Sequence, residues 1–516
     1  MIVIGAGCAG MIAALEARSA GARVWMIHRA PLGAGTNSAL AGGTFSGPTP
    51  HYPAEAYIKD TLRTGRWINR EGLVRQLAEN GEQCFLFLRS LGLSLVEFSH
   101  GYALRSRRPE TTPGATLVRA LSKRVSGDPE INLMTGFYVT DILKHDGSVW
   151  GVKGFDKTGK ECVVQAPAVV LATGGAGGVY LRNDNQKGIM GRGYHLAATV
   201  GAELRDMEFV QFHPLVVAEP RLPSFPLYFP LPEEARLTNE RGENVLEKYG
   251  IASLNEATKT RRDEISVILY QERLHDALLM DYRKVPEPSW DQYPLTRLKK
   301  MRFDFRNRPF AVSPAVHFFM GGVAIGEDGQ TSLPGLFACG EVAGGVHGAN
   351  RMRGNALTEC VVFGRIAGIH AARYALEHQA FPSGRKERLQ EEPSSPSTSE
   401  KGLMKLKRQI QETAWQYAGV VRSERGLMEG MARLRGLEDE LKRIRPQAVL
   451  EIVLKGDLSS AVFVLRAVLT ASLSREESRG AFAREDFPQK DDPRWAKSSC
   501  WIYDASGGTF LIRHSP

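Results

Sequence analysis

The sequence predicts an α/β fold in which a Rossmann-like dinucleotide-binding domain is interrupted by an inserted domain and followed by a helical domain. Three observations carry this prediction. A short β-branched strand at residues 2–4 leads through a glycine-rich turn into a helix. A second glycine-rich segment of the same style follows residue 334, beyond a proline-rich stretch. Residues 402–480 have amphipathic helical periodicity and many charges.

The first glycines have the Gly-x-Gly-x-x-Gly spacing of a phosphate-binding turn. We expect Gly5 to permit the sharp turn, Gly7 to let the backbone approach a pyrophosphate, and Gly10 to let the helix pack closely on the strand. The helix N-terminus would present unpaired N–H groups and a partial positive charge to the phosphates. The opening of the chain therefore predicts a dinucleotide cofactor.

Later elements follow from local patterns. The second strand is expected at residues 22–27, before a loop rich in Gly, Ser and Thr, and residues 54–95 have helical apolar spacing. Three strands of a meander are expected near Val139, Val149 and Cys162, with glycine turns between them. The run from Ala168 to Gly175 is typical of a buried parallel strand that ends in glycine.

A change in composition marks the domain boundaries. Prolines cluster after Leu215 and charged helical segments follow, so residues 216–312 are expected to form the inserted domain, with residues 1–215 and 313–380 forming the domain that it interrupts. Residues 381–401 are rich in Pro and Ser and predict a flexible linker. Residues 402–516 are then the helical domain and its tail.

Bulk properties restrict the class of protein. A chain of 516 residues with 43% hydrophobic and 24% charged residues indicates a soluble, cytoplasmic protein of several domains. No run approaches the roughly 18 apolar residues that span a bilayer, and the first residues already form a core strand, so we expect neither membrane insertion nor a retained signal peptide. The net charge of +9 is scattered, which favours anionic small molecules over nucleic acid.

The six cysteines form no CxxC pair and no cluster with the spacing of metal ligands. We therefore expect buried thiols, no metal site and no iron–sulfur centre within this chain.

The second glycine-rich segment carries the more specific signal. A strand runs into Gly340 and Glu341, a loop delivers Arg351, and a helix begins near Asn355. The Glu341 carboxylate is suited to accept hydrogen bonds from a ribose or ribityl hydroxyl.

Seven segments in order along the chain together resemble the flavoprotein family of fumarate reductase and succinate dehydrogenase, which also contains L-aspartate oxidase. They are GAGCAG at 5–10, ATGGAGGVY at 172–180, DMEFVQFHP at 206–214, RRDEIS at 261–266, HFFMGG at 317–322, GEVAGGVHGANRMRGNAL at 340–357 and SREESRGAFAREDFP at 474–488. The resemblance spans nearly the whole chain.

The resemblance implies an FAD-binding domain with a Rossmann-like fold, an inserted α+β capping domain and a C-terminal helical domain. It also implies which residues bind FAD. These are Gly5, Gly7, Cys8, Ala9, Gly10, His28, Arg29, Thr36, Asn37, Ser38, Gly42, Gly43, Ala172, Thr173, Gly174, Gly175, Asp206, Gly340, Glu341, Asn355, Ala356 and Leu357. The helix N-terminus at 355–357 would face the pyrimidine end of the flavin and stabilise negative charge there.

The implied reaction moves a hydride between flavin N5 and a carbon of a dicarboxylate double bond, and delivers a proton on the other face. By motif, Arg262 corresponds to the family's proton donor, although Arg261 is adjacent. His213, His317 and Arg351 correspond to the groups that bind substrate carboxylates. A planar guanidinium can grip a carboxylate at two points, and histidines add donors. Electrons would be exchanged with a separate partner, such as an iron–sulfur protein, which would also allow peripheral attachment to a membrane.

Several positions depart from the family pattern. The acid expected after the second strand is replaced by His28 and Arg29, and the loop at 35–43 contains no histidine, so FAD is expected to be non-covalent. The family's Thr-Glu pair, whose glutamate serves the proton relay, is missing from the stretch 227–236, where Glu233 or Glu234 is the candidate replacement. Arg353 stands where the family has a small residue.

Two alternatives remain open from the sequence. One is an enzyme similar to L-aspartate oxidase, which dehydrogenates the Cα–N bond of an amino acid. The other is a non-catalytic flavoprotein that relays electrons in a larger complex, which the missing Thr-Glu pair favours.

Overall fold

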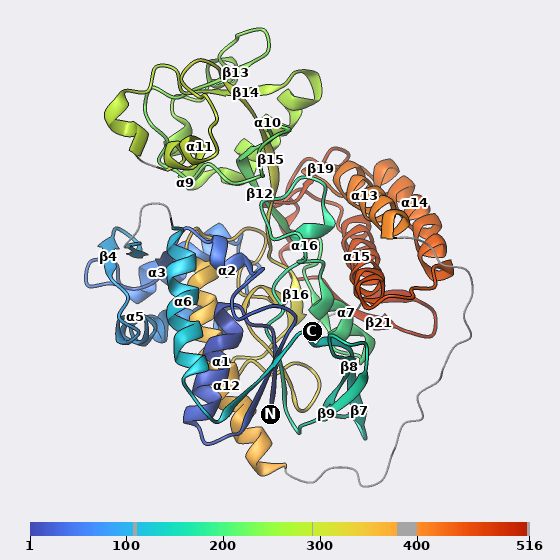
Figure 1. Cartoon of the computed structure of the whole chain (residues 1–516). Helices are drawn as coiled ribbons and strands as arrows, with labels where there is room; N and C mark the ends of the chain where they lie inside the picture. The colour runs from blue at the N-terminus through green and yellow to red at the C-terminus, as the bar shows by residue number, and fades with distance from the viewer. Residues whose placement is uncertain (107–110, 292, 379–399, 513–516) are drawn as a thin grey trace.

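The computed structural model describes residues 1–106, 111–291, 293–378 and 400–512. Figure 1 shows a central α/β body, a lobe that rises above it, and a layer of long C-terminal helices along one side. The predicted α/β fold class, with a Rossmann-like domain, an inserted domain and a C-terminal helical domain, is confirmed. Of the expected linker at 381–401, residues 381–399 lie outside the described residues.

Five parallel strands form the central sheet in the order β17-β10-β1-β2-β6. Their bounds are Ile2–Ile4 (β1), Val24–His28 (β2), Ile131–Thr135 (β6), Val169–Leu171 (β10) and Leu336–Ala338 (β17). Strands β17, β10 and β1 consist entirely of buried apolar residues, as expected for a parallel sheet covered on both faces. The carboxyl ends of the strands meet at one edge, where ligands bind in open α/β sheets.

Helices α1 (Cys8–Ser19), α6 (Pro113–Ser126) and α12 (Asn355–Glu377) lie together on one side of this sheet, and the antiparallel meander of β7 (Tyr138–His145), β8 (Ser148–Phe155) and β9 (Glu161–Gln165) lies on the other side (Figure 1). The rest of the body is made of short elements. They are α2 (Asn37–Leu40), β3 (Thr44–Ser46), α3 (Ala54–Thr64), α4 (Glu71–Glu79), α5 (Gly81–Ser90), β4 (Leu95–Phe98), β5 (Gly101–Leu104), η1 (Gly177–Val179), α7 (Arg192–Thr199), β11 (Leu204–Arg205), β16 (Gly322–Ala324), η3 (Gly340–Val342) and β18 (Ala343–Gly344).

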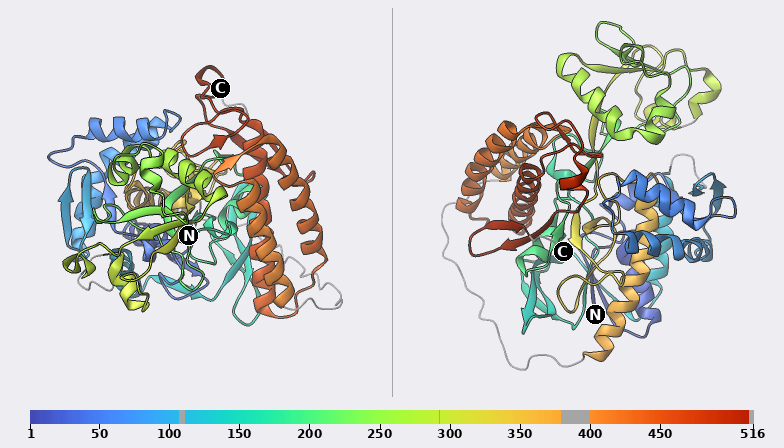
Figure 2. Two further views of the ribbon diagram at one scale, coloured as in Figure 1. Left: turned by 90° about the horizontal axis from the view of Figure 1, so that it is seen from above. Right: turned by 180° about the vertical axis from the view of Figure 1, so that it is seen from behind.

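The inserted lobe has a hydrophobic core of its own, which runs in sequence from Leu215 to Val312. Two long strands, β12 (Val210–Val217) and β15 (Phe310–Phe319), pair antiparallel and connect the lobe to the body, as the view from behind shows (Figure 2). The lobe adds β13 (Arg236–Asn239), β14 (Leu278–Asp281), α8 (Val245–Lys248), α9 (Leu254–Thr260), α10 (Arg262–His275), η2 (Glu287–Asp291) and α11 (Leu295–Lys300). We call it the capping domain.

The C-terminal helices α13 (Glu400–Tyr417), α14 (Glu424–Arg443) and α15 (Val449–Ser474) bury their apolar faces in the same core as the central sheet. A buried ionic network fastens them. Arg475 pairs with Glu208 at 2.7 Å and with Glu477 at 2.8 Å, and Arg479 pairs with Glu477 at 2.6 Å. Both arginines belong to the segment at 474–488, which therefore joins the C-terminal helices to the central body.

The end of the chain, expected from the sequence to be a tail after the helical domain, contains further short elements. After β19 (Val421–Arg422), β20 (Ala483–Arg484) and α16 (Asp492–Trp495), strands β21 (Cys500–Asp504) and β22 (Thr509–Ile512) join the sheet β18-β16-β11-β21-β22. The pairing of β21 with β11 is long-range, so local periodicity at the C-terminus does not reveal it.

Candidate functional site

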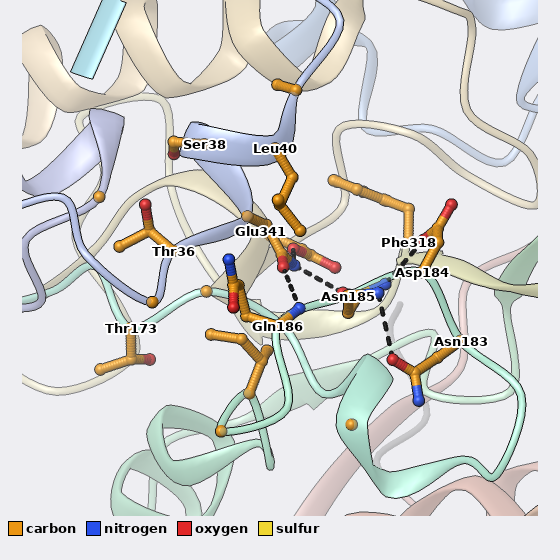
Figure 3. A pocket seen from close by; sticks show the side chains of 18 of the residues that line it. Thr36, Ser38, Leu40, Thr173, Asn183, Asp184, Asn185, Gln186, Phe318 and Glu341 are labelled. Carbon is orange, nitrogen blue, oxygen red and sulfur yellow. Dashed lines mark hydrogen bonds between the residues drawn. The ribbon is translucent and has the colours of Figure 1, made fainter. Parts of the chain in front are cut away.

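A cavity of about 1310 Å³ opens at the carboxyl ends of the parallel strands and extends to the capping domain. The residues that follow four of these strands line it, at 5–9, 28–30, 172–174 and 339–341. Figure 3 views part of this cavity, with Thr36, Ser38, Thr173 and Glu341 around it. Its position matches the general location of dinucleotides in open α/β sheets.

The turn at the start of α1 is shaped for close approach of a phosphate. Gly5 has φ +112°, and a Cβ there would lie 2.2 Å from the Ala172 carbonyl oxygen. A Cβ on Gly10 would lie 2.0 Å from the Gly5 carbonyl oxygen. Gly7 precedes α1 and makes no side-chain cap. The Cys8 N–H donates to Ser38 Oγ at 3.0 Å, and the next N–H groups of this 12-residue helix, at Ala9 and Gly10, remain available to a ligand. The turn therefore fits a pyrophosphate.

We expect Gly5→Ala to yield protein that loses its flavin on gel filtration, because the added methyl group would displace the Ala172 carbonyl and distort the turn. The flavin-to-protein absorbance ratio measures the loss, and we expect it to fall severalfold. Gly21→Ala is the matched control, since Gly21 also has positive φ, +91°, but nothing lies within 4 Å of its Cβ position. Equal flavin content in the two variants would contradict the role assigned to the turn.

Glu341 is buried beside the cavity. Its Oε1 accepts a hydrogen bond from the Phe319 N–H at 3.1 Å and its Oε2 accepts one from Asn37 Nδ2 at 3.4 Å. Burial raises the pKa of Glu341 to about 7. Figure 3 shows its carboxyl group beside the Asn185–Gln186 loop. A hydroxyl-bearing ligand would supply the further donors that a buried carboxylate needs.

Elsewhere in the cavity lining, Arg29 follows β2 and pairs with Asp457 of α15 at 2.7 Å, and it donates a second bond to the Gly188 carbonyl at 3.0 Å. The C-terminal helices thus contribute to the wall of the cavity. His28, just before, is buried and contacts the Ala30 carbonyl through Nδ1.

Most of the cofactor-binding residues predicted from sequence line this cavity. They are Gly5, Gly7, Cys8, Ala9, His28, Arg29, Thr36, Asn37, Ser38, Gly42, Gly43, Ala172, Thr173, Gly174, Gly340, Glu341, Ala356 and Leu357. Four other predicted residues do not line the cavity. Gly10 packs α1 against the turn, and Gly175 leaves room for the Glu341 side chain. Buried Asn355 bonds to the Tyr57 hydroxyl at 3.1 Å.

Asp206, the fourth, lies away from the cavity, in the interface with the C-terminal segment. It accepts hydrogen bonds from the Ser498 hydroxyl at 3.0 Å and from the Ser499 N–H at 3.0 Å. Burial and neighbouring Glu208 raise the pKa of Asp206 to about 7. Asp206 therefore serves the domain interface in this structure and does not line the cofactor cavity.

All four residues predicted to bind or protonate a substrate line the end of the cavity under the capping domain. His213 on β12 and His317 on β15 face each other across paired strands, with ring centroids 5.4 Å apart. Arg262 is the first residue of α10, and Arg351 comes from the loop before α12. The side chain of Gln211 connects the two arginines, because its amide donates to the Arg351 carbonyl at 3.0 Å and its oxygen accepts from Arg262 Nη1 at 3.5 Å.

Position distinguishes the two adjacent arginines. Arg262 lines the cavity, and the start of its helix is held by an ion pair between Asp263 and Arg66 at 2.6 Å. Arg261 is exposed and pairs with Glu264 at 3.4 Å. Burial first, and then the charges of Arg351 and Arg353, lower the pKa of Arg262 to about 9. Burial lowers the pKa of Arg351 to about 10.

The stretch 227–236, where the resemblance leads us to look for a Thr-Glu pair, places a tyrosine in the cavity wall. Leu227, Phe229 and Leu231 alternate into the core of the capping domain, so Tyr228 faces the other way and lines the cavity. Glu233 and Glu234 are exposed and are absent from the cavity lining, so the expectation that one of them replaces the relay glutamate is wrong. The period-2 burial of the apolar residues decides this orientation.

Three further residues at this end were not assigned to the site from sequence. Arg353 lines the cavity and donates to the Phe229 carbonyl of the capping domain at 3.0 Å, and Arg297 of α11 lies against the Phe225 ring at 4.3 Å. Asp184, in the loop before α7, pairs with His317 at 2.7 Å. The unusual Arg353 could be noticed in the sequence, whereas Asp184 and Arg297 belong to no spacing pattern.

The comparisons with known proteins agree with this geometry. Residues 1–357 match the FAD binding domain family, and residues 407–516 match the family described as the fumarate reductase flavoprotein C-terminal region. The chain belongs to the FAD-dependent flavoproteins of the fumarate reductase, succinate dehydrogenase and L-aspartate oxidase family. Its cofactor is therefore FAD, an assignment that the cavity and its glycine turn fit.

Individual relatives cover nearly the whole chain. One subunit of the fumarate reductase (CoM/CoB) of Methanothermobacter marburgensis is 31% identical over 96% of both chains. L-aspartate oxidase of Caulobacter vibrioides is 32% identical over 95% of this chain and 94% of its own. A chain of the E. coli quinol fumarate reductase has a TM-score of 0.85 at 25% identity, and covers 100% of this chain and 96% of its own. The flavoprotein assignment thus holds along the whole length.

Within the residues that the structure describes, no helix combines the length and apolarity needed to cross a membrane. The same part of the chain contains no cluster of three or more His, Cys, Asp or Glu side chains arranged to hold a metal ion.

Proposed function

We propose that this flavoprotein transfers reducing equivalents between FAD and the CH–CH bond of a small dicarboxylate, as a fumarate reductase does. The observation that carries the proposal is the excess of guanidinium groups at one end of the cavity. Arg262, Arg297, Arg351 and Arg353 all line it. Among the described residues, none of the four forms an ion pair with a carboxylate within 4.0 Å.

The electrostatics of this end favour a dianion. Burial lowers the pKa values of both Arg262 and Arg351, and the charges of Arg351 and Arg353 lower that of Arg262 further. Asp184 lines the same end of the cavity, and it is already hydrogen-bonded to His317. A ligand with two carboxylates would offset this positive charge and accept the planar donor pairs that arginine presents.

The side chains then have separate tasks. When bound, FAD supplies hydride transfer chemistry at its N5. Arg351 and the two histidines hold the carboxylates and polarise the double bond. Arg262 holds the proton that is delivered to the substrate carbon. A guanidinium is ordinarily too weak an acid for this task, but burial beside two other arginines brings its pKa to about 9.

This assignment predicts the pH dependence of reduction. Protonated Arg262 is the donor, so kcat at saturating unsaturated acid should be constant well below pH 9 and fall tenfold per pH unit above about pH 9. Steady-state assays with a reduced dye between pH 6 and 10.5 measure the profile. A profile that rises through this range would contradict the assignment of Arg262 as acid.

We further propose that electrons are exchanged with a separate redox protein, such as an iron–sulfur protein. The support is that one relative of nearly equal length is named as one of the subunits of a fumarate reductase. Such a partner would make any membrane association peripheral for this chain.

L-aspartate oxidase activity is the second candidate, because a relative of that name is 32% identical over almost the full length. An amino acid would bring an ammonium group, which needs a carboxylate acceptor. The substrate end presents four guanidinium groups. The carboxylates among the described cavity-lining residues are Asp184, already bonded to His317, and Glu341, already bonded to the Phe319 N–H and Asn37. This balance favours a dicarboxylate without an ammonium group.

Anaerobic and aerobic assays on the FAD-loaded chain test the proposal. Fumarate should reoxidise the dye-reduced flavin rapidly, whereas L-aspartate should bleach the oxidised flavin slowly or not at all. Rapid bleaching by L-aspartate, with peroxide formed in air, would instead establish the oxidase. A flavin spectrum that neither fumarate, succinate nor L-aspartate perturbs would favour the non-catalytic relay.

A further inference from the structure

A histidine–carboxylate pair stands inside the proposed anion site. His317 Nδ1 lies 2.7 Å from Asp184 Oδ2, and the side chain of Asp184 is only 3% exposed. Asp184 is held on two sides, because Asn185 Nδ2 donates to its Oδ1 at 3.1 Å and its own N–H donates to the Val316 carbonyl at 3.1 Å. Figure 3 shows Asp184 and Asn185 adjacent in the cavity wall. The pair is therefore rigid before any substrate arrives.

The two histidines of the site are held in different tautomers. The Leu215 N–H donates to His213 Nδ1 at 3.3 Å, so the proton of neutral His213 resides on Nε2. Burial and the charges of His317 and Arg262 keep the pKa of His213 well below its usual value. His213 is thus a fixed neutral donor.

His317 is the reverse case. Its Nδ1 donates to the Asp184 carboxylate, so Nε2 is the nitrogen that gains or loses a proton. The side chain is 21% exposed on the cavity, and Nε2 has no hydrogen-bond partner among the described residues. Neutral His317 would present a lone pair to a carboxylate, which repels it, whereas protonated His317 would present an N–H and a positive charge.

We propose that Asp184 is a positioning residue that makes His317 a proton-linked clamp, so that binding of a dicarboxylate takes up a proton at His317 Nε2. The inference rests on the proposed function, since it presumes an anionic substrate at this end of the cavity. The step is a simple protonation: the proton joins the Nε2 lone pair from solvent, and no other bond is formed or broken.

The charged and titratable groups around His317 set the direction of the effect. His213 on β12, Arg262 on α10, Arg351 and Arg353 before α12, and Tyr228 of the capping domain line the same end. The arginines disfavour a further positive charge on His317, while Asp184 and an incoming dianion favour it. Affinity should therefore be highest at low pH and fall as His317 loses its proton, up to tenfold per pH unit.

Calorimetry on the FAD-loaded protein tests this without turnover. Malonate, an unreactive dicarboxylate, is titrated between pH 6 and 9 in two buffers with different ionisation enthalpies, which gives the number of protons taken up. Wild-type protein should take up a substantial fraction of a proton in this range. Asp184→Asn should move the uptake to lower pH and weaken malonate binding at pH 8 on the order of tenfold.

Controls separate positioning from general damage. Glu272→Gln removes a buried carboxylate of the capping domain that does not line the cavity, and it should leave proton uptake unchanged. In a His317→Gln background, adding Asp184→Asn should not weaken malonate binding, because the carboxylate then has no imidazolium to stabilise and its removal only relieves repulsion of the dianion. A tenfold loss of affinity in that background would overturn the proposal.

If Asp184→Asn does not fold, ¹⁵N NMR of histidine-labelled wild-type protein decides the matter. The signals of His317 are identified as those that disappear in His317→Gln. In the wild-type spectra they should show Nδ1 protonated at every pH, and Nε2 protonated once malonate is added. An Nε2–H tautomer at high pH would overturn the proposal. If Asp184→Asn binds malonate with the same proton uptake as wild-type protein, this inference alone is overturned. If wild-type protein binds neither malonate nor fumarate, the proposed function is overturned as well.

Discussion

Arg262→Gln will retain FAD and bind a dicarboxylate, yet its rate of turnover will fall by roughly 10²–10⁴-fold, the usual contribution of a positioned proton donor. The glutamine can keep the weak contact to Gln211, now 3.5 Å from Arg262, but it has no acidic proton to give. Stopped-flow reoxidation of the reduced flavin by fumarate measures the loss. Dye reduction of the flavin, which needs no substrate proton, should remain at the wild-type rate.

Arg261→Gln is the matched control, because Arg261 is adjacent, exposed and paired only with Glu264 at 3.4 Å among the described residues. It should keep nearly full turnover. If Arg261→Gln is the inactive variant and Arg262→Gln is active, the proton donor has been assigned one residue out of register.

Arg351→Gln should weaken dicarboxylate binding on the order of 10²-fold or more, since a charge-assisted, two-point contact from a buried side chain is lost. Arg351 is 6% exposed, its Nε has no partner within the described residues, and its guanidinium rests on the Phe318 ring at 4.5 Å. Among the described residues, the Arg351 guanidinium forms no ion pair with a carboxylate, and the ring contact holds it in place before a ligand binds. The dissociation constant of malonate, from flavin difference spectra, measures the effect.

Arg351→Lys separates charge from geometry. The ammonium keeps the positive charge but lacks the planar fork, so its affinity should fall between those of wild type and Arg351→Gln. Affinity equal to wild type in both variants would exclude Arg351 from the anion site.

The sequence predicted the parts of the site that local chemistry imposes. In the turn at Gly5–Gly10, a strand, a helix and a phosphate come close together within a few residues, and only glycine leaves enough room. The spacing of the glycines in the sequence therefore reveals this turn. Arg351 and His317 could be named because they stand in segments that resemble a known family, and the structure brings them to one cavity end.

Other residues of the site could not be predicted from the sequence, because segments far apart in the chain come together to form that part of the site. Asp184 acquires its role only where the loop before α7 meets β15, 133 residues later, and Arg297 arrives from α11 of the capping domain. Glu233 and Glu234 looked suitable by charge, but the alternating burial of Leu227, Phe229 and Leu231 turns Tyr228 toward the cavity instead. Apolar burial contributes more free energy than the placement of an exposed glutamate.

The sequence by itself contains the short-range constraints, namely steric limits at glycines and the periodicity of buried strands and helices. These constraints were sufficient to predict the fold class, the cofactor turn and the three-part organisation. Long-range packing alone determines which charges meet beneath the capping domain. Four arginines, two histidines and one aspartate converge there from segments that no spacing rule connects, because the two hydrophobic cores, and not the charges, decide how those segments come together.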